Sequence, residues 1–126
     1  MVSALAADTA ETSSPGPTVT FGNEIEALRA AVADLQGQGV APIIALTHVG
    51  YVADQRIAAQ VPGLAAVVGG HSHTFLSASS PSRQGPYPTW VDNEDGSIVP
   101  VVTAGAYSRY LGHLVLELDD AGTLIY

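Results

Sequence analysis

The chain has 126 residues, enough for one domain with a modest hydrophobic core. Its composition is 47% hydrophobic and 13% charged, and no apolar run reaches the roughly 20 residues that cross a bilayer. The net charge of −8 leaves no basic face, so we expect neither a nucleic-acid nor a membrane partner. The chain has no cysteine, which excludes disulfides and thiolate metal sites. Residues 1–10 lack the basic start and apolar stretch of a signal peptide.

Residues 1–22 are expected to form an irregular N-terminal segment, because 12–17 read Thr-Ser-Ser-Pro-Gly-Pro, a cluster of helix and strand breakers. A helix is then predicted from Asn23, whose side chain can accept hydrogen bonds from free backbone N–H groups. Apolar residues follow at spacings of 3, 4 and 3, which is the period of one helix face. They are Ile25, Leu28, Val32 and Leu35. Gly37 and Gly39 are expected to end the helix.

The next three segments predict a β-α-β unit. Residues 42–46 have the length and composition of a buried strand, 53–60 those of a short helix, and 64–68 those of a second buried strand. Because the connections are short, the two strands should be parallel and joined by a right-handed crossover.

The chain changes character after residue 73. Residues 77–88 are rich in Ser and Pro and predict a surface loop. Residues 89–91 and 98–102 flank an Asp-Gly turn and predict a β-hairpin, so we interpret 77–97 as a loop and hairpin insertion. Residues 112–118 alternate apolar and polar side chains, which predicts a half-exposed strand.

Three of the four histidines follow predicted strands. His48 follows the first strand of the β-α-β unit, and His71 and His73 follow the second. The carboxyl ends of parallel strands meet at one edge of a sheet, where ligands collect, and imidazole is a common ligand of transition metals. We therefore expect the three imidazoles to converge there, close enough to share one divalent ion. The alternatives are a histidine hydrogen-bonded to backbone at 48 and a Gly-rich turn with solvent-exposed histidines at 69–73.

Other candidates carry weaker signals. His113 is better interpreted as a surface or packing histidine than as a ligand. Arg109 has the chemistry of a phosphate clamp, but a solvated arginine between two tyrosines is the better interpretation. The acidic residues at 92–95 lack the spacing of an EF-hand and indicate a hairpin turn. Tyr87 and Trp90 are expected to cover an apolar edge rather than to stack on a base.

Two motifs then identify a family. Ile43-Ile44-Ala45-Leu46-Thr47-His48 and Val67-Val68-Gly69-Gly70-His71-Ser72-His73, in this order and spacing, resemble the C-terminal half of the metallophosphoesterase (calcineurin-like) domain of the 5′-nucleotidase and UDP-sugar hydrolase family. The resemblance covers nearly the whole chain. It implies an α/β fold in which the β-α-β unit, the hairpin and antiparallel strands form half of a four-layer α/β/β/α sandwich. Residues 1–126 would then be a partial metallophosphoesterase domain.

The resemblance also implies a metal site. His48 and His71 would be ligands of one metal, and His73 would take the place of a residue that ligates or borders the other metal and the phosphate. The implied cofactors are two divalent ions, with Zn, Mn, Fe and Co all suited to nitrogen and oxygen ligands.

The residues between these histidines acquire roles by the same resemblance. Gly69 and Gly70 would leave space beside the dinuclear centre, next to the substrate. Thr47 and Ser72 would be hydrogen-bond partners of the metal ligands, although packing alone explains them equally well. The implied substrate is a nucleotide or another phosphate ester.

The family strings Asp-x-His, Gly-Asp-x-x-Asp and Gly-Asn-His-Glu or -Asp do not occur in the chain. In the family they supply the bridging carboxylate and the histidine that protonates the leaving group. We therefore expect no complete catalytic set here, and an inactive fragment of a periplasmic, secreted or cell-surface phosphohydrolase. The alternative is a truncated or decayed non-catalytic module with at most weak metal binding. An apolar face built from 98–102 and 114–118 would then be exposed, so we expect a homo-oligomer, with strand exchange between copies as one route to it.

Overall fold

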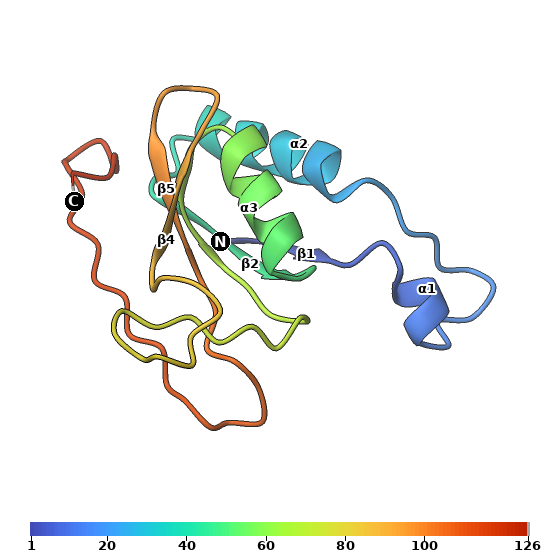
Figure 1. The fold of residues 1–126 in the computed structure, drawn as a ribbon. Helices are drawn as coiled ribbons and strands as arrows, with labels where there is room; N and C mark the ends of the chain where they lie inside the picture. Colours follow the sequence, from blue (N-terminus) through green and yellow to red (C-terminus); the bar gives the residue numbers. More distant parts are fainter. Residues whose placement is uncertain (126) are drawn as a thin grey trace.

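The computed structural model describes residues 1–125, which form a five-stranded sheet with helices on one face (Figure 1). The strands are β1 (Val2–Leu5), β2 (Ile43–His48), β3 (Leu64–Val68), β4 (Thr89–Asp92) and β5 (Ile98–Val102). The helices are α1 (Thr9–Thr12), α2 (Glu24–Gly37) and α3 (Tyr51–Gln60). The spatial order of the strands is β1-β2-β3-β5-β4. The predicted α/β class is confirmed.

The β2-α3-β3 unit has the predicted parallel arrangement, with Ala45 beside Val67 in the register. The bounds of β3 are those expected from the sequence, but β2 continues to His48 and α3 begins at Tyr51, two residues before the expected start. Gly50 has a φ of 93°, so the chain turns from strand to helix within two residues. His48 is thus the last residue of a strand.

The hairpin prediction is also confirmed. β4 and β5 pair antiparallel, with Val91 beside Val99. In addition β5 pairs parallel with β3, so the hairpin extends the sheet instead of standing apart from it. The sheet is therefore mixed, with four mutually parallel strands and one antiparallel edge strand.

The prediction of an irregular segment over residues 1–22 is wrong at its beginning. Residues 2–5 form β1, an edge strand parallel to β2 with Val2 beside Ala45, and residues 9–12 form one turn of helix, α1. A four-residue strand carries too little local pattern to be recognised by itself. The open edge of β2 supplies the hydrogen-bonding partner that makes it a strand.

The predicted strand over residues 112–118 does not form. This segment runs as an extended tail, and its one bridge, between Leu118 and Leu124, closes the turn at 119–122. An alternating pattern gives a strand only where the segment pairs with a sheet edge. Here the edges of the described sheet are β1 and β4, and the tail pairs with neither.

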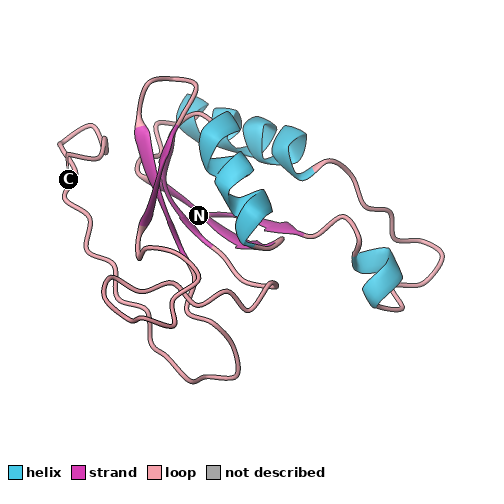
Figure 2. Cartoon of the chain, viewed as in Figure 1, coloured by secondary structure: helices cyan, strands magenta, loops and turns pink. Residues whose placement is uncertain are grey.

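Helices α2 and α3 cover one face of the sheet, as Figure 2 shows. Asn23 caps α2 as predicted, since its Oδ1 accepts hydrogen bonds from the backbone N–H of Ile25 at 3.0 Å and of Glu26 at 3.1 Å. The core lies between the helices and the sheet. It contains Leu28, Val32, Ile57 and Ala58 from the helices and Ala45, Val67, Val99 and Val101 from the strands.

The other face of the sheet carries half-exposed apolar side chains. Leu46 is 45% exposed, and Trp90 and Ile98 are each 50% exposed. They alternate along their strands with the buried residues of the helix-covered face. His48 follows Leu46 by two residues and therefore belongs to the same open face. Within the described chain, none of the helices has the length and apolarity needed to cross a bilayer.

Candidate functional site

His48 and His71 lie side by side at the carboxyl edge of the parallel strands. His48 ends β2, and His71 comes three residues after the end of β3. Their ring centroids are 5.2 Å apart, with an angle of 68° between the ring planes. Two imidazoles bound to one tetrahedral ion have ring centres about 5 Å apart. The spacing of this pair therefore fits two ligands of a shared ion.

The backbone around the two rings is tightly constrained. A Cβ atom at Gly70 would lie 3.0 Å from Nδ1 of His48, and one at Gly50 would lie 3.6 Å from Cδ2 of His71. His71 itself has a φ of 75°, in the left-handed region that residues with a Cβ rarely adopt. Such a conformation persists only where the surrounding structure determines it. The position of the His71 ring is thus set by the fold rather than by local preference.

His73 is not part of this pair. Its ring packs edge-on against Tyr107, with centroids 5.2 Å apart, and its φ is 56°. Among residues 1–125, no group of three His, Asp or Glu side chains lies close enough together to hold an ion. The expectation that all three imidazoles share one ion is therefore wrong. In this sharp loop the ring of His71 lies beside His48, whereas the ring of His73 lies beside Tyr107.

Asp54 is a buried residue of the site that sequence reasoning missed. It lies in the first turn of α3 and is fully buried. The hydroxyl of Thr47 donates a hydrogen bond of 2.5 Å to Oδ1 of Asp54, whereas Oδ2 has no hydrogen-bond partner. Burial raises the pKa of Asp54 to about 6, against the opposing effect of the Thr47 hydrogen bond. The sequence pattern that could have revealed Asp54 is its spacing in the helix. It precedes Ile57 by three residues and Ala58 by four, which places its carboxyl group on the apolar face.

The position of Asp54 also explains why residue 69 is a glycine. A Cβ atom at Gly69 would overlap Oδ2 of Asp54. The volume that a side chain at position 69 would take is therefore filled by a carboxyl group, and is not open space for a substrate on that side. Gly70, by contrast, faces His48.

Thr47 and Ser72 connect backbone segments around the histidines. The Thr47 hydroxyl lies 3.3 Å from the carbonyl oxygen of Val68, in addition to its bond to Asp54. The Ser72 hydroxyl accepts a hydrogen bond of 3.0 Å from the N–H of Tyr51 and shares one of 2.7 Å with Thr74. Thus both hydroxyls bond to the segments that carry the rings.

No protein family model matches the chain. A snake venom 5′-nucleotidase from Gloydius brevicauda is 46% identical over 117 residues, which is 90% of this chain and 20% of that protein. A 5′-nucleotidase from Homo sapiens is 45% identical over 117 residues, with the same coverage of 90% and 20%. The chain belongs to the 5′-nucleotidase family. It spans about a fifth of the length of the curated relatives that it matches.

Solved structures agree with this membership of the 5′-nucleotidase family. The 5′-nucleotidase precursor from Thermus thermophilus superposes with a TM-score of 0.87 at 39% identity, covering 96% of this chain and 24% of that one. The NAD nucleotidase of Haemophilus influenzae superposes with a TM-score of 0.87 at 30% identity, covering 93% and 24%. The family resemblance stated from the two histidine motifs is confirmed.

The remaining candidate residues of this 5′-nucleotidase-family chain lie elsewhere. Arg109 and His113 are exposed on the segment after β5. Trp90 stands on the open face of the sheet, and Tyr87 contacts the Gly112 backbone region. Asp95 lies in the turn between β4 and β5 and accepts a hydrogen bond from the N–H of Ser97. Burial alone would raise its pKa, but hydrogen bonds from Ser97 and Gly63 hold the pKa below its ordinary value.

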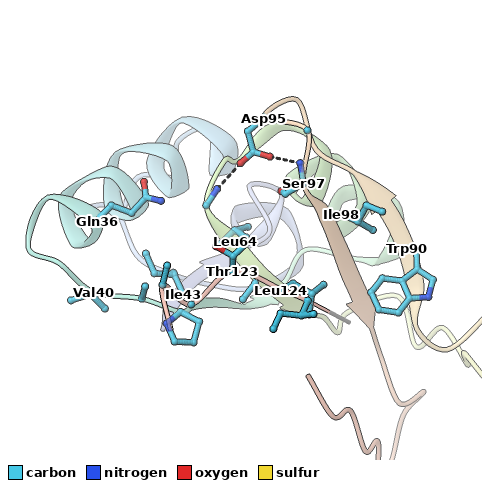
Figure 3. A pocket seen from close by; sticks show the side chains of 18 residues that line it. Gln36, Val40, Ile43, Leu64, Trp90, Asp95, Ser97, Ile98, Thr123 and Leu124 are labelled. Carbon is cyan, nitrogen blue, oxygen red and sulfur yellow. Dashed lines mark hydrogen bonds between the residues drawn. The ribbon is translucent and has the colours of Figure 1, made fainter. Parts of the chain in front are cut away.

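A pocket of about 680 Å³ lies at the opposite edge of the sheet from the histidines. Ile43 and Leu64, the first residues of β2 and β3, line it together with Trp90 and Leu124 (Figure 3). Figure 3 also shows the two hydrogen bonds of Asp95 at its rim. Because it is at the amino ends of the parallel strands, this pocket is separate from the histidine site.

Proposed function

We propose that His48 and His71 are two ligands of a divalent metal ion in a hydrolase that cleaves phosphate esters of nucleotides. One observation carries this proposal. The two imidazoles lie 5.2 Å apart at the carboxyl edge of β2 and β3, in a chain that belongs to the 5′-nucleotidase family. The relatives that carry the name 5′-nucleotidase are four to five times longer than this chain. Nucleotide hydrolysis is therefore a proposal for this protein.

The donor atoms fit part of such a centre. Two neutral imidazoles suit Zn, Mn, Fe or Co, and their separation suits one ion. Two adjacent ions need an anionic bridge, and the carboxyl group of Asp54 is buried in the fold and bonded to Thr47. We therefore propose that the bridging carboxylate, the second ion's further ligands and the general acid lie outside this chain. A bound divalent metal lowers the pKa of water and neutralises phosphate charge.

The chain's own residues shape the surroundings of this centre. Gly70 leaves room for the His48 ring, which a side chain at position 70 would displace. His73 is exposed beside Tyr107 and is available to donate a hydrogen bond to a phosphate oxygen. Thr47 and Ser72 hold the backbone on either side. These residues shape the surroundings of the proposed metal ion. The remaining metal ligands and the general acid would come from another part of the longer protein.

We propose that this longer protein is secreted or exposed at the cell surface, since relatives of this chain include a venom 5′-nucleotidase. The 126-residue chain by itself should not hydrolyse AMP or p-nitrophenyl phosphate above background with zinc, manganese or cobalt. The reason is the missing bridge and general acid. Metal-dependent turnover that His71→Ala abolishes would contradict this expectation.

Calorimetric titration with Zn²⁺ tests the metal assignment. At pH 7.5 we expect weak binding that His71→Ala removes and that the matched control His113→Ala, on the exposed tail, leaves unchanged. Absence of binding to the unsubstituted chain, or equal binding by the His71→Ala variant, would instead support a non-catalytic module.

A further inference from the structure

We propose that Asp54 is a positioning residue that sets the spacing of His48 and His71 by bracing the end of β2 against the segment that follows β3. This inference deepens the proposed function and rests on it for its importance to metal binding. Asp54 touches neither ring in the contacts described above. Its effect would pass through the residues next to them.

The contact toward β2 is a hydrogen bond. Thr47, which directly precedes His48, donates its hydroxyl proton to Oδ1 of Asp54 at 2.5 Å. A hydrogen bond to a carboxyl group is stronger than one between neutral groups when the carboxyl is ionised. Because Thr47 and Asp54 are both buried, this bond is shielded from competing water. The position of Asp54 therefore fixes the last buried residue of β2.

The contact toward β3 is steric. Oδ2 of Asp54 occupies the space where a Cβ atom at residue 69 would stand. Gly69 is itself anchored, since its N–H donates a hydrogen bond of 2.8 Å to the carbonyl oxygen of Val102 in β5. The carboxyl group thus packs against a fixed backbone, two residues before His71. Removal of this group would leave a cavity directly beneath the Gly-Gly segment.

Asp54 is firmly held from its own side. Its backbone N–H donates to the carbonyl oxygen of Gly50 at 2.8 Å, and α3 is fastened to the core by buried Ile57 and Ala58. One side chain therefore joins α3, the end of β2 and the start of the Gly69–His73 loop.

Packing alone does not account for a carboxyl group at this place. Oδ2 is buried without a hydrogen-bond partner, and burying a carboxyl group in this way is unfavourable relative to an apolar side chain of similar size. Burial also raises the pKa of this group to about 6. The Asp54 carboxyl lowers the stability of the fold and contacts both segments that carry the histidines. A role in the site explains why it is present.

The test compares Asp54→Ala and Asp54→Asn in the 126-residue chain. Asp54→Asn keeps the shape and still accepts the Thr47 hydrogen bond. Asn93→Ala is the matched control, since Asn93 is also buried and donates to Ala58 and Val61 at the other end of α3, at 2.6 and 2.9 Å. The readouts are the nuclear Overhauser contact between the His48 and His71 rings, the imidazole ¹⁵N shifts and the Zn²⁺ dissociation constant.

We expect Asp54→Ala to lose the contact between the rings and to weaken Zn²⁺ binding about tenfold or more. Asp54→Asn should retain both properties. Asn93→Ala should lower the unfolding temperature without changing either. Unchanged ring contacts and Zn²⁺ affinity in a folded Asp54→Ala variant would overturn the proposal.

Two further outcomes separate this proposal from the proposed function. If the unsubstituted chain binds no Zn²⁺ but Asp54→Ala still loses the ring contact, the metal function fails and the positioning role stands. If Asp54→Ala does not fold, Thr47→Val decides, because it removes only the hydrogen-bond donor. Loss of the ring contact in Thr47→Val supports the proposal, and retention of that contact overturns it.

Discussion

Gly70 faces the His48 ring, and a Cβ atom at residue 70 would lie 3.0 Å from Nδ1 of that ring. Real Cβ atoms seldom come so close to a ring nitrogen, so a side chain at position 70 requires the imidazole to shift by a few tenths of an ångström. The ring ends a strand and is exposed on its other side, which leaves it free to do so. The second glycine of the Gly-Gly pair therefore leaves the His48 imidazole in a position that a side chain at residue 70 would crowd.

Gly70→Ala should displace the His48 ring with little change in the fold. We expect the ring contact between His48 and His71 to weaken in nuclear Overhauser spectra and the Zn²⁺ affinity of the chain to fall. Gly22→Ala is the control, since a Cβ atom there meets nothing within 4 Å. Identical imidazole spectra for Gly70→Ala and the unsubstituted chain would contradict this prediction.

The stability of the chain should depend on pH through Asp54. The pKa of this buried carboxyl is raised from 3.8 to about 6 in the folded chain, so the folded state holds a proton that the unfolded state releases. Stability contributed by the neutral form is present below the unfolded pKa and is lost as pH rises through about 6. The whole titration corresponds to about 3 kcal/mol.

Urea unfolding at several pH values between 4 and 8 measures this effect. Asp54→Asn cannot ionise, so its stability relative to the unsubstituted chain should increase from pH 4 to about pH 6 and level off above that, where Asp54 is ionised in both states. A constant difference between the two proteins would show that Asp54 has an ordinary pKa.

Three polar contacts should differ in their contribution to stability. Asn93→Ala leaves two buried carbonyl groups at the end of α3 without donors and should cost about 1–3 kcal/mol. Asn23→Ala removes the cap of α2 and should cost about 1 kcal/mol. Arg29→Ala breaks an ion pair with Glu94 that is nearly half exposed, and should cost less than about 0.5 kcal/mol. Urea unfolding at one pH gives the ranking, and the reverse order would contradict it.

The open face of the sheet should drive self-association. Leu46, Trp90 and Ile98 are half exposed there, and apolar burial stabilises by about 25 cal/mol per Å². The net charge of −8 opposes association, but salt screens it within about 10 Å at 0.1 M. We expect a homodimer or a larger oligomer.

Light scattering after size-exclusion chromatography tests this expectation. Trp90→Glu should shift the protein toward the monomer. Val52→Glu is the control, because Val52 is 70% exposed on α3, away from that face. A mass near 12.9 kDa at every concentration up to the millimolar range would rule out the association.

Local patterns were sufficient for several elements of this chain. The cap at Asn23 with its apolar stripe predicted α2, the apolar run at 64–68 predicted β3, and the Asp-Gly turn predicted the hairpin. Each of these signals lies within about a dozen residues, so neighbours in the chain already determine the structure. The same order of strands predicted that His48 and His71 would reach one edge of the sheet.

Other features depend on partners far away in the chain. Residues 2–5 form a strand because they pair with the edge of β2, and residues 112–118 form none because they pair with neither edge strand of the described sheet. His73 turns toward Tyr107, and Asp54 is buried beneath Gly69, through contacts between segments 15 or more residues apart. Local periodicity specifies which face of an element is apolar. Only the packed chain decides which backbone edge finds a partner and which polar group is enclosed.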